Sequence, residues 1–133
     1  MRWPALWLLL LFVLTGCATG RTSRVDGSVP RGQALSGQAS WYGRPHHGRR
    51  TASGEIYDMN KMTAAHRTLP LGSRVLVTNR ENGRTVEVRI NDRGPFRKDR
   101  VLDLSYAAAR SLGAVGDGVI PVTLKIVTGA AAD

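Results

Sequence analysis

The stretch that decides the fold is residues 74–96, which read RVLVTNRENGRTVEVRINDRGPF. Apolar and polar side chains alternate in residues 85–90, which predicts a β-strand that buries one face, and the apolar run within residues 74–78 predicts a second strand. Asn82-Gly83 lies between these strands, and both residues tolerate the positive φ of a type I′ turn. The sequence therefore predicts a tight antiparallel hairpin.

Asp92 follows the second predicted strand, at the position that continues its apolar face. Val86, Val88 and Ile90 share that face, because successive strand side chains alternate. If the strand extends to Asp92, the carboxyl group lies at the rim of the core, where burial raises its pKa and suits it to be a general acid. Alternatively, Asp92 only organises the Gly94-Pro95 turn by accepting backbone hydrogen bonds. Strand parity does not decide between these interpretations.

The remaining segments predict a small, mainly β domain. Further strands are expected at 39–42 and 119–127, and residues 63–66 fit either a short strand or a helical turn. Ser105 can cap a helix that Gly113 closes. Several short strands with one or two short helices indicate a small barrel.

The N-terminus predicts export and lipidation. A short apolar run, too short to span a bilayer, ends at Cys17, the only cysteine of the chain. This arrangement resembles the lipobox of bacterial lipoproteins; the alternative is an ordinary secretory signal with an incidental thiol. We expect residues 1–16 to be a signal peptide, Cys17 to carry lipid, and 17–37 to be a flexible tether. Ala18 favours the outer membrane, so the domain is expected on the periplasmic side.

The net charge of +9 and the pI near 11.0 point to an anionic partner. Nucleic acid and the cell envelope are the two candidates. An exported protein meets envelope polymers, and no aromatic-basic interleaving or zinc-finger spacing is present. The sequence therefore predicts no nucleic-acid binding.

Several runs resemble the rare lipoprotein A (RlpA-like) family. They occur in the family's order and cover residues 37–127: ASWYG, HGRRTASGEIYDM, TAAH, LPLG and INDRGPF. The resemblance implies a six-stranded double-psi β-barrel over residues 38–128. It also implies an endolytic lytic transglycosylase, which cleaves peptidoglycan glycan strands and leaves 1,6-anhydro-N-acetylmuramic acid ends.

The family's site residues transfer by motif. They place Asp92, His66 and Glu55 in the catalytic centre, with Asp92 as the acid and base, and Asp58 in support. Trp41 and Tyr42 can stack on sugar rings, although packing is the more frequent role of a strand-end Trp. Arg93 is a candidate for binding substrate anions, against a default of solvated surface.

Other expectations are absences and rival functions. The three histidines lack HExxH spacing, so no metal or cofactor is predicted. No C-terminal SPOR domain, which many family members carry, follows the barrel, and a monomer is expected. A non-catalytic, expansin-like peptidoglycan-binding lipoprotein is the main alternative; a hydrolase and a structural lipoprotein are further ones.

Overall fold

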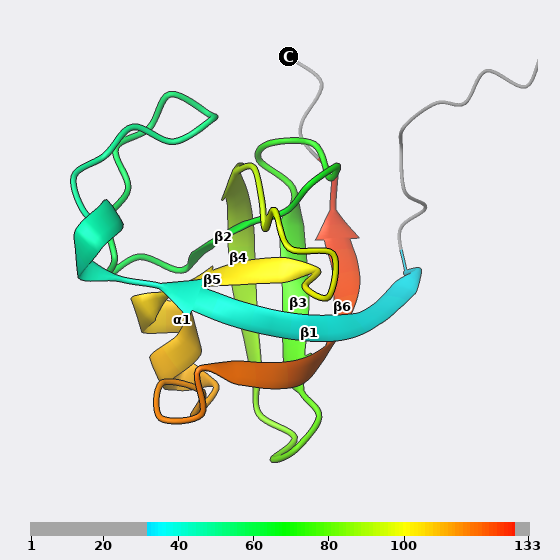
Figure 1. Cartoon of the computed structure of the whole chain (residues 1–133). Helices are drawn as coiled ribbons and strands as arrows, with labels where there is room; N and C mark the ends of the chain where they lie inside the picture. The colour runs from blue at the N-terminus through cyan, green and yellow to red at the C-terminus, as the bar shows by residue number, and fades with distance from the viewer. Residues whose placement is uncertain (1–31, 130–133) are drawn as a thin grey trace, which may run out of the picture.

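Six β-strands close into a barrel in the computed structural model, which describes residues 32–129 (Figure 1). Around the barrel the order is β1-β5-β2-β4-β3-β6. The pairs β1–β5 and β2–β4 are parallel and the other four are antiparallel. The strands are β1 (Ala34–Tyr42), β2 (Thr63–Ala65), β3 (Arg74–Asn79), β4 (Thr85–Asp92), β5 (Leu102–Ser105) and β6 (Val119–Thr128). The predicted mainly β, six-stranded barrel is confirmed.

The hairpin of β3 and β4 confirms the alternation that the sequence predicts. Val88 and Ile90 are fully buried, whereas Thr85 and Glu87 on the other face are exposed. The prediction of a tight two-residue turn is wrong, because five residues, 80–84, connect the two strands. Asn79 closes this longer loop: its side chain accepts from the N–H of Glu81, and its carbonyl accepts from that of Gly83.

The interior of the barrel is filled mainly by branched aliphatic side chains from four strands, β3 to β6. Alternating strand positions supply them, as expected for a small closed barrel. Fully buried members include Val75, Val77, Val88, Ile90, Leu102, Leu104, Ile120, Val122 and Leu124. This core fixes the backbone from which the functional side chains project.

Strand β1 begins at Ala34, four residues before the predicted start of the barrel. The interpretation of residues 34–37 as tether is wrong, because they pair with β6. Leu35 packs against the core. Gly37 lies so close to Val101, the residue before β5, that an added Cβ would come within 2.4 Å of its side chain. The predicted signal peptide and Cys17 lie outside the described residues.

Two helical segments flank the barrel. α1 (Tyr106–Ser111) begins where predicted, because the Ser105 hydroxyl accepts from the N–H of Ala108. Gly113, with φ of +68°, follows its end. The short 3-10 helix η1 (Arg44–His46) follows β1. Within 32–129, no helix has the length and apolar character needed to cross a membrane.

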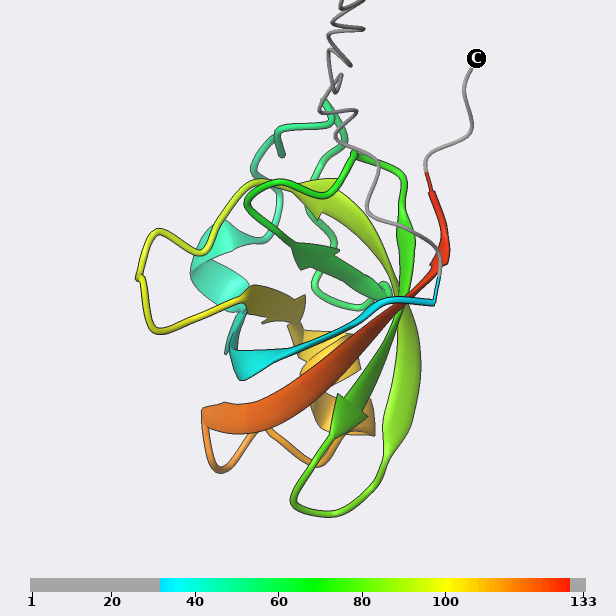
Figure 2. The same ribbon diagram turned by 90° about the vertical axis from the view of Figure 1, so that its right-hand side faces the viewer.

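Two loops gather at one side of the barrel (Figure 2). One runs from η1 to β2 and the other joins β4 to β5. Arg67 holds the second loop, donating from Nη1 to the carbonyls of Pro95 and Arg97. The second loop and His46 of η1 help to line one pocket, described next.

Candidate active site

A pocket of about 440 Å³, which we call the acidic pocket after its two carboxylates, opens between the end of β1 and the β4–β5 loop. Two carboxylates line it, Asp92 from β4 and Asp103 from β5. Aromatic and cationic residues complete the lining: Trp41, Tyr42, His46, Phe96, Arg93, Arg97 and Arg100. Phe96 is 92% exposed and stands at the rim.

The sheet register places the two carboxylates on either side of one small residue. Ala65 of β2 pairs with Asp92 on one side and with Asp103 on the other. The side chain of Ala65 also lines the pocket and leaves room between the two acids. The barrel itself therefore sets the spacing of the pair.

Asp92 accepts backbone hydrogen bonds and also lines the pocket. The β2–β4 register shifts before it, so Asn91 is buried as well as Ile90 and the alternation breaks. Asp92 is half-buried, and its Oδ1 accepts from the N–H groups of Ala52 (3.0 Å) and Arg93 (2.8 Å). The carboxyl group thus organises the turn and also faces the pocket.

Asp103 is the pocket carboxylate that sequence reasoning missed. Its Oδ1 accepts from the Ser40 hydroxyl at 2.6 Å. Gly94, at φ of +132°, passes close by, and an added Cβ would lie 3.6 Å from Asp103 Oδ2. Glycine is required here, because other residues rarely adopt this φ.

Tyr42 supplies a polar group beside both acids. Its hydroxyl is buried and has no hydrogen-bond partner within residues 32–129. Burial raises the pKa of Tyr42 far above its usual range, and the charge of Asp92 adds to this. Tyr42 therefore stays neutral, with a hydroxyl group that can donate a hydrogen bond.

Glu55 lies beside this pocket but does not line it. Its carboxylate accepts two bonds from Arg89 (2.6 and 3.0 Å) and one from Asn91 Nδ2 (3.1 Å). Hydrogen bonding to Arg89 lowers the pKa of Glu55. The pairing attaches the loop around Glu55 to the end of β4, next to Asp92.

His66 is buried directly behind Asp92. Its Nδ1 accepts from the N–H groups of Thr68 (3.1 Å) and Leu69 (3.0 Å), which requires a neutral ring. Burial lowers its pKa, and the charges of Arg67 and Arg93 add to this. The backbone N–H of His66 donates to the Asp92 carbonyl, so the two residues are joined through their backbones.

Of the other predicted substrate-binding residues, some line the acidic pocket and one does not. Trp41 lines the acidic pocket, as Tyr42 does. Arg93 also lines it, while donating to the carbonyls of His66 and Leu69. Asp58 does not line it; its Oδ1 accepts from the N–H of Asn60. Among residues 32–129, no three His, Cys, Asp or Glu side chains come together as metal ligands.

Fold and pocket together define a class: a small six-stranded barrel with two carboxylates at the loop-bearing rim. A family model described as lytic transglycolase, of double-psi β-barrel type, matches residues 34–124. The chain belongs to this RlpA-like lytic transglycolase family.

Named relatives agree with this assignment. The endolytic peptidoglycan transglycosylase RlpA of Vibrio cholerae is 54% identical over 99 residues, 74% of this chain and 38% of the relative. The protein of the same name from Neisseria meningitidis serogroup A is 55% identical, over 86% of this chain and 51% of the relative. The chain thus spans between about a third and a half of these relatives' lengths.

Solved structures extend the likeness to other activities. The Streptomyces papain inhibitor has a TM-score of 0.64 at 28% identity, and the match covers 76% of this chain and all of the inhibitor. The Clavibacter michiganensis expansin has a TM-score of 0.59 at 25% identity, covering 75% of this chain and 53% of the expansin. Function must therefore be argued from the pocket and not from the fold.

Proposed function

We propose that this protein is an endolytic peptidoglycan lytic transglycosylase. The observation that carries the proposal is the pair of carboxylates, Asp92 and Asp103, in one pocket with the unpartnered hydroxyl of Tyr42. Cleavage of glycosidic bonds needs a proton donor and a group that stabilises positive charge at the sugar. The relatives named for this activity, at about 55% identity, support the same reaction.

In the proposed reaction, no water is consumed. Asp92 donates a proton to O4 of N-acetylglucosamine as the bond from C1 of N-acetylmuramic acid to O4 breaks. The 6-hydroxyl of the same muramic acid bonds to C1 and gives its proton to Asp92, which restores the acid. Asp103 faces the sugar as a carboxylate and stabilises the positive charge that develops at C1.

The remaining predicted residues support this chemistry. Tyr42 donates a hydrogen bond to the substrate, and Trp41 and Arg93 contact it from the pocket lining. His66 and Glu55 act as positioning residues: the backbone N–H of His66 donates to the Asp92 carbonyl, and the Glu55 carboxylate accepts from the side chain of Asn91, the residue before Asp92. Asp58 orders the turn that carries Asn60.

The lipid anchor and the location belong to the same proposal. Cys17, lipidated after removal of residues 1–16, would tether the barrel on the periplasmic side of the outer membrane. The anchor would bring the domain to its glycan substrate as a monomer, without cofactor or nucleic acid. Labelled fatty acid incorporated by wild-type protein and absent from Cys17→Ser would support it; equal labelling would contradict it.

The experiment that tests the activity is digestion of purified cell-wall sacculi with product masses. Wild-type protein should release muropeptides with 1,6-anhydro ends, and Asp92→Asn should release few or none. Equal release by Asp92→Asn would remove Asp92 from the acid role. Reducing ends in place of anhydro ends would identify a hydrolase.

Non-catalytic peptidoglycan binding is the second candidate, favoured by the likeness to an expansin. It predicts that wild-type protein binds sacculi and leaves the glycan masses unchanged. The paired carboxylates argue against it, because binding alone does not require two acids in one pocket.

A further inference from the structure

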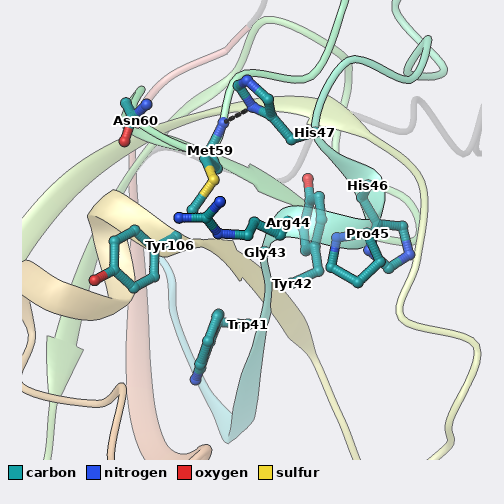
Figure 3. A pocket seen from close by; sticks show the side chains of 10 residues that line it. All are labelled: Trp41, Tyr42, Gly43, Arg44, Pro45, His46, His47, Met59, Asn60 and Tyr106. Atoms are coloured by element: carbon teal, nitrogen blue, oxygen red, sulfur yellow. Dashed lines mark hydrogen bonds between the residues drawn. The ribbon is translucent and has the colours of Figure 1, made fainter.

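A second, larger cavity lies next to the acidic pocket. It encloses about 880 Å³ between β1, η1, the 59–60 turn and the start of α1 (Figure 3). Its lining is mainly apolar and aromatic, with a few polar groups at the edges: Trp41, Tyr42, Pro45, Met59, Tyr106, Arg44, His46, His47 and Asn60. This composition is typical of a pocket for a small organic ligand.

The aromatic cavity and the acidic pocket are continuous. Trp41, Tyr42 and His46 line both. A chain molecule whose reacting bond lies at Asp92 and Asp103 would extend directly into the aromatic cavity. The occupant that fits this continuity is therefore a further unit of the same polymeric substrate.

Two aromatic rings form the wall of the cavity. The rings of Trp41 and Tyr106 are 5.6 Å apart between centroids and inclined at 58°, so they converge without stacking on each other. Both residues are half-buried. Gly43 allows this arrangement, because an added Cβ would lie 2.9 Å from the Trp41 ring. Converging faces suit the apolar C–H face of a pyranose ring.

The turn opposite this wall is held in place before any ligand arrives. The N–H of Met59 donates to His47 Nδ1 at 3.1 Å, as Figure 3 shows, and the Met59 carbonyl accepts from the N–H of Ala107. Asp58 fixes the N–H of Asn60 at 2.9 Å. A preformed cavity loses less conformational entropy on binding.

We propose that the aromatic cavity is a sugar subsite, which binds an N-acetylated pyranose unit adjacent to the units joined by the cleaved bond. Trp41 and Tyr106 contact the ring, and the Arg44 guanidinium and Asn60 amide bind its acetamido oxygen and hydroxyls. The subsite rests on the proposed function for its ligand class. Its consequence is that affinity rises with glycan length until the cavity is filled.

The test measures the affinity of peptide-free glycan oligomers of increasing length for the full chain carrying Asp92→Asn, which prevents turnover. Adding Tyr106→Leu should reduce the gain in affinity between the shortest and longest oligomers by about tenfold, the effect of a moderate aromatic contact. Asn60→Ala, which removes only an edge group, should reduce the same gain by a smaller factor. Lys125→Gln is the control, because Lys125 is exposed on β6 and lines neither pocket, and it should leave the gain unchanged.

The outcomes separate this inference from the proposed activity. An unchanged gain in both Tyr106→Leu and Asn60→Ala, with melting temperatures near that of the parent, would overturn the subsite. If Tyr106→Leu does not fold, the result for Asn60→Ala decides. Absence of anhydro products from wild-type protein would contradict the transglycosylase, while the affinity series would still support or overturn a sugar subsite.

Discussion

The polar residues around Asp92 fall into two sets that differ in what their side chains contact. Asp103 and Tyr42 face the acidic pocket, and the Tyr42 hydroxyl has no partner in the part of the chain described. Glu55 and His66 stand outside it, with their side chains bonded to Arg89, Asn91 and backbone N–H groups. The first set lines the pocket in which we propose that substrate binds, whereas the side chains of the second set are bonded within the protein. Turnover and stability should therefore respond differently to changes in the two sets.

The largest expected effect is on turnover by Asp103→Asn. Loss of the charge that faces the sugar should lower kcat by about 10²–10⁴-fold, the range typical of a carboxylate that acts in the reaction. The melting temperature should change little, because Asn keeps an oxygen that can accept from Ser40.

Release of anhydro-muropeptides measures this effect. Asp117→Asn is the matched control, since Asp117 is exposed in the loop between α1 and β6 and does not line the pocket. A loss of turnover as large in Asp117→Asn, or no loss in Asp103→Asn, would contradict the distinction between the two sets.

His66→Ala should act first on stability. It leaves the N–H groups of Thr68 and Leu69 without their acceptor, and an unpaired buried donor costs about 1–3 kcal/mol of unfolding free energy. His66→Asn, which retains an acceptor oxygen, should recover part of the loss. Urea denaturation measures both variants, and stability unchanged in His66→Ala would refute the role as acceptor.

The pH dependence of stability should also reflect the protonation of His66. The pKa of His66 is lowered in the folded state, so below its ordinary value of about 6.5 the unfolded chain binds more protons. Its contribution is fully present above pH 6.5 and is lost as the pH falls through the folded-state value. Thermal unfolding between pH 7 and pH 5 should show this slope in wild type and less of it in His66→Asn; equal slopes would contradict it.

The smallest expected effect is that of Glu55→Gln on stability. The pKa of Glu55 is lowered chiefly by hydrogen bonding to Arg89, so its contribution is present above about pH 4.3 and is lost at lower pH. The pair is partly exposed, which limits the change at neutral pH to under about 1 kcal/mol. Turnover should fall less in Glu55→Gln than in Asp103→Asn. A fall as large as that of Asp103→Asn would indicate that Glu55 acts directly in the reaction.

The sequence predicted what depends on local pattern. The β3–β4 hairpin and the capped helix followed from alternation and from Ser105, because neighbours in the chain carry those signals. Strand β5 was not predicted, because four residues give too short a pattern and its partners lie near residues 40 and 64. Asp103 lies on β5 and was missed with it.

The site was predicted only in part, for a related reason. Motifs identified Asp92, Glu55 and His66 but not which atoms each would contact. His66 follows TAA in a strand, and only the fold brings the N–H groups of Thr68 and Leu69 to its ring. Likewise, the register shift before Asp92 depends on pairing with Ala65, which the sequence of β4 alone does not specify.

The register at Ala65 has a consequence for how this domain can diverge. Two strand-to-strand steps separate the backbones of Asp92 and Asp103, a distance of about 10 Å that the hydrogen-bonded sheet fixes. Insertions and deletions in the surrounding loops leave that distance unchanged. The loops around the pocket can therefore vary in sequence and length, while the backbones of Asp92 and Asp103 keep their separation without further substitutions in the strands.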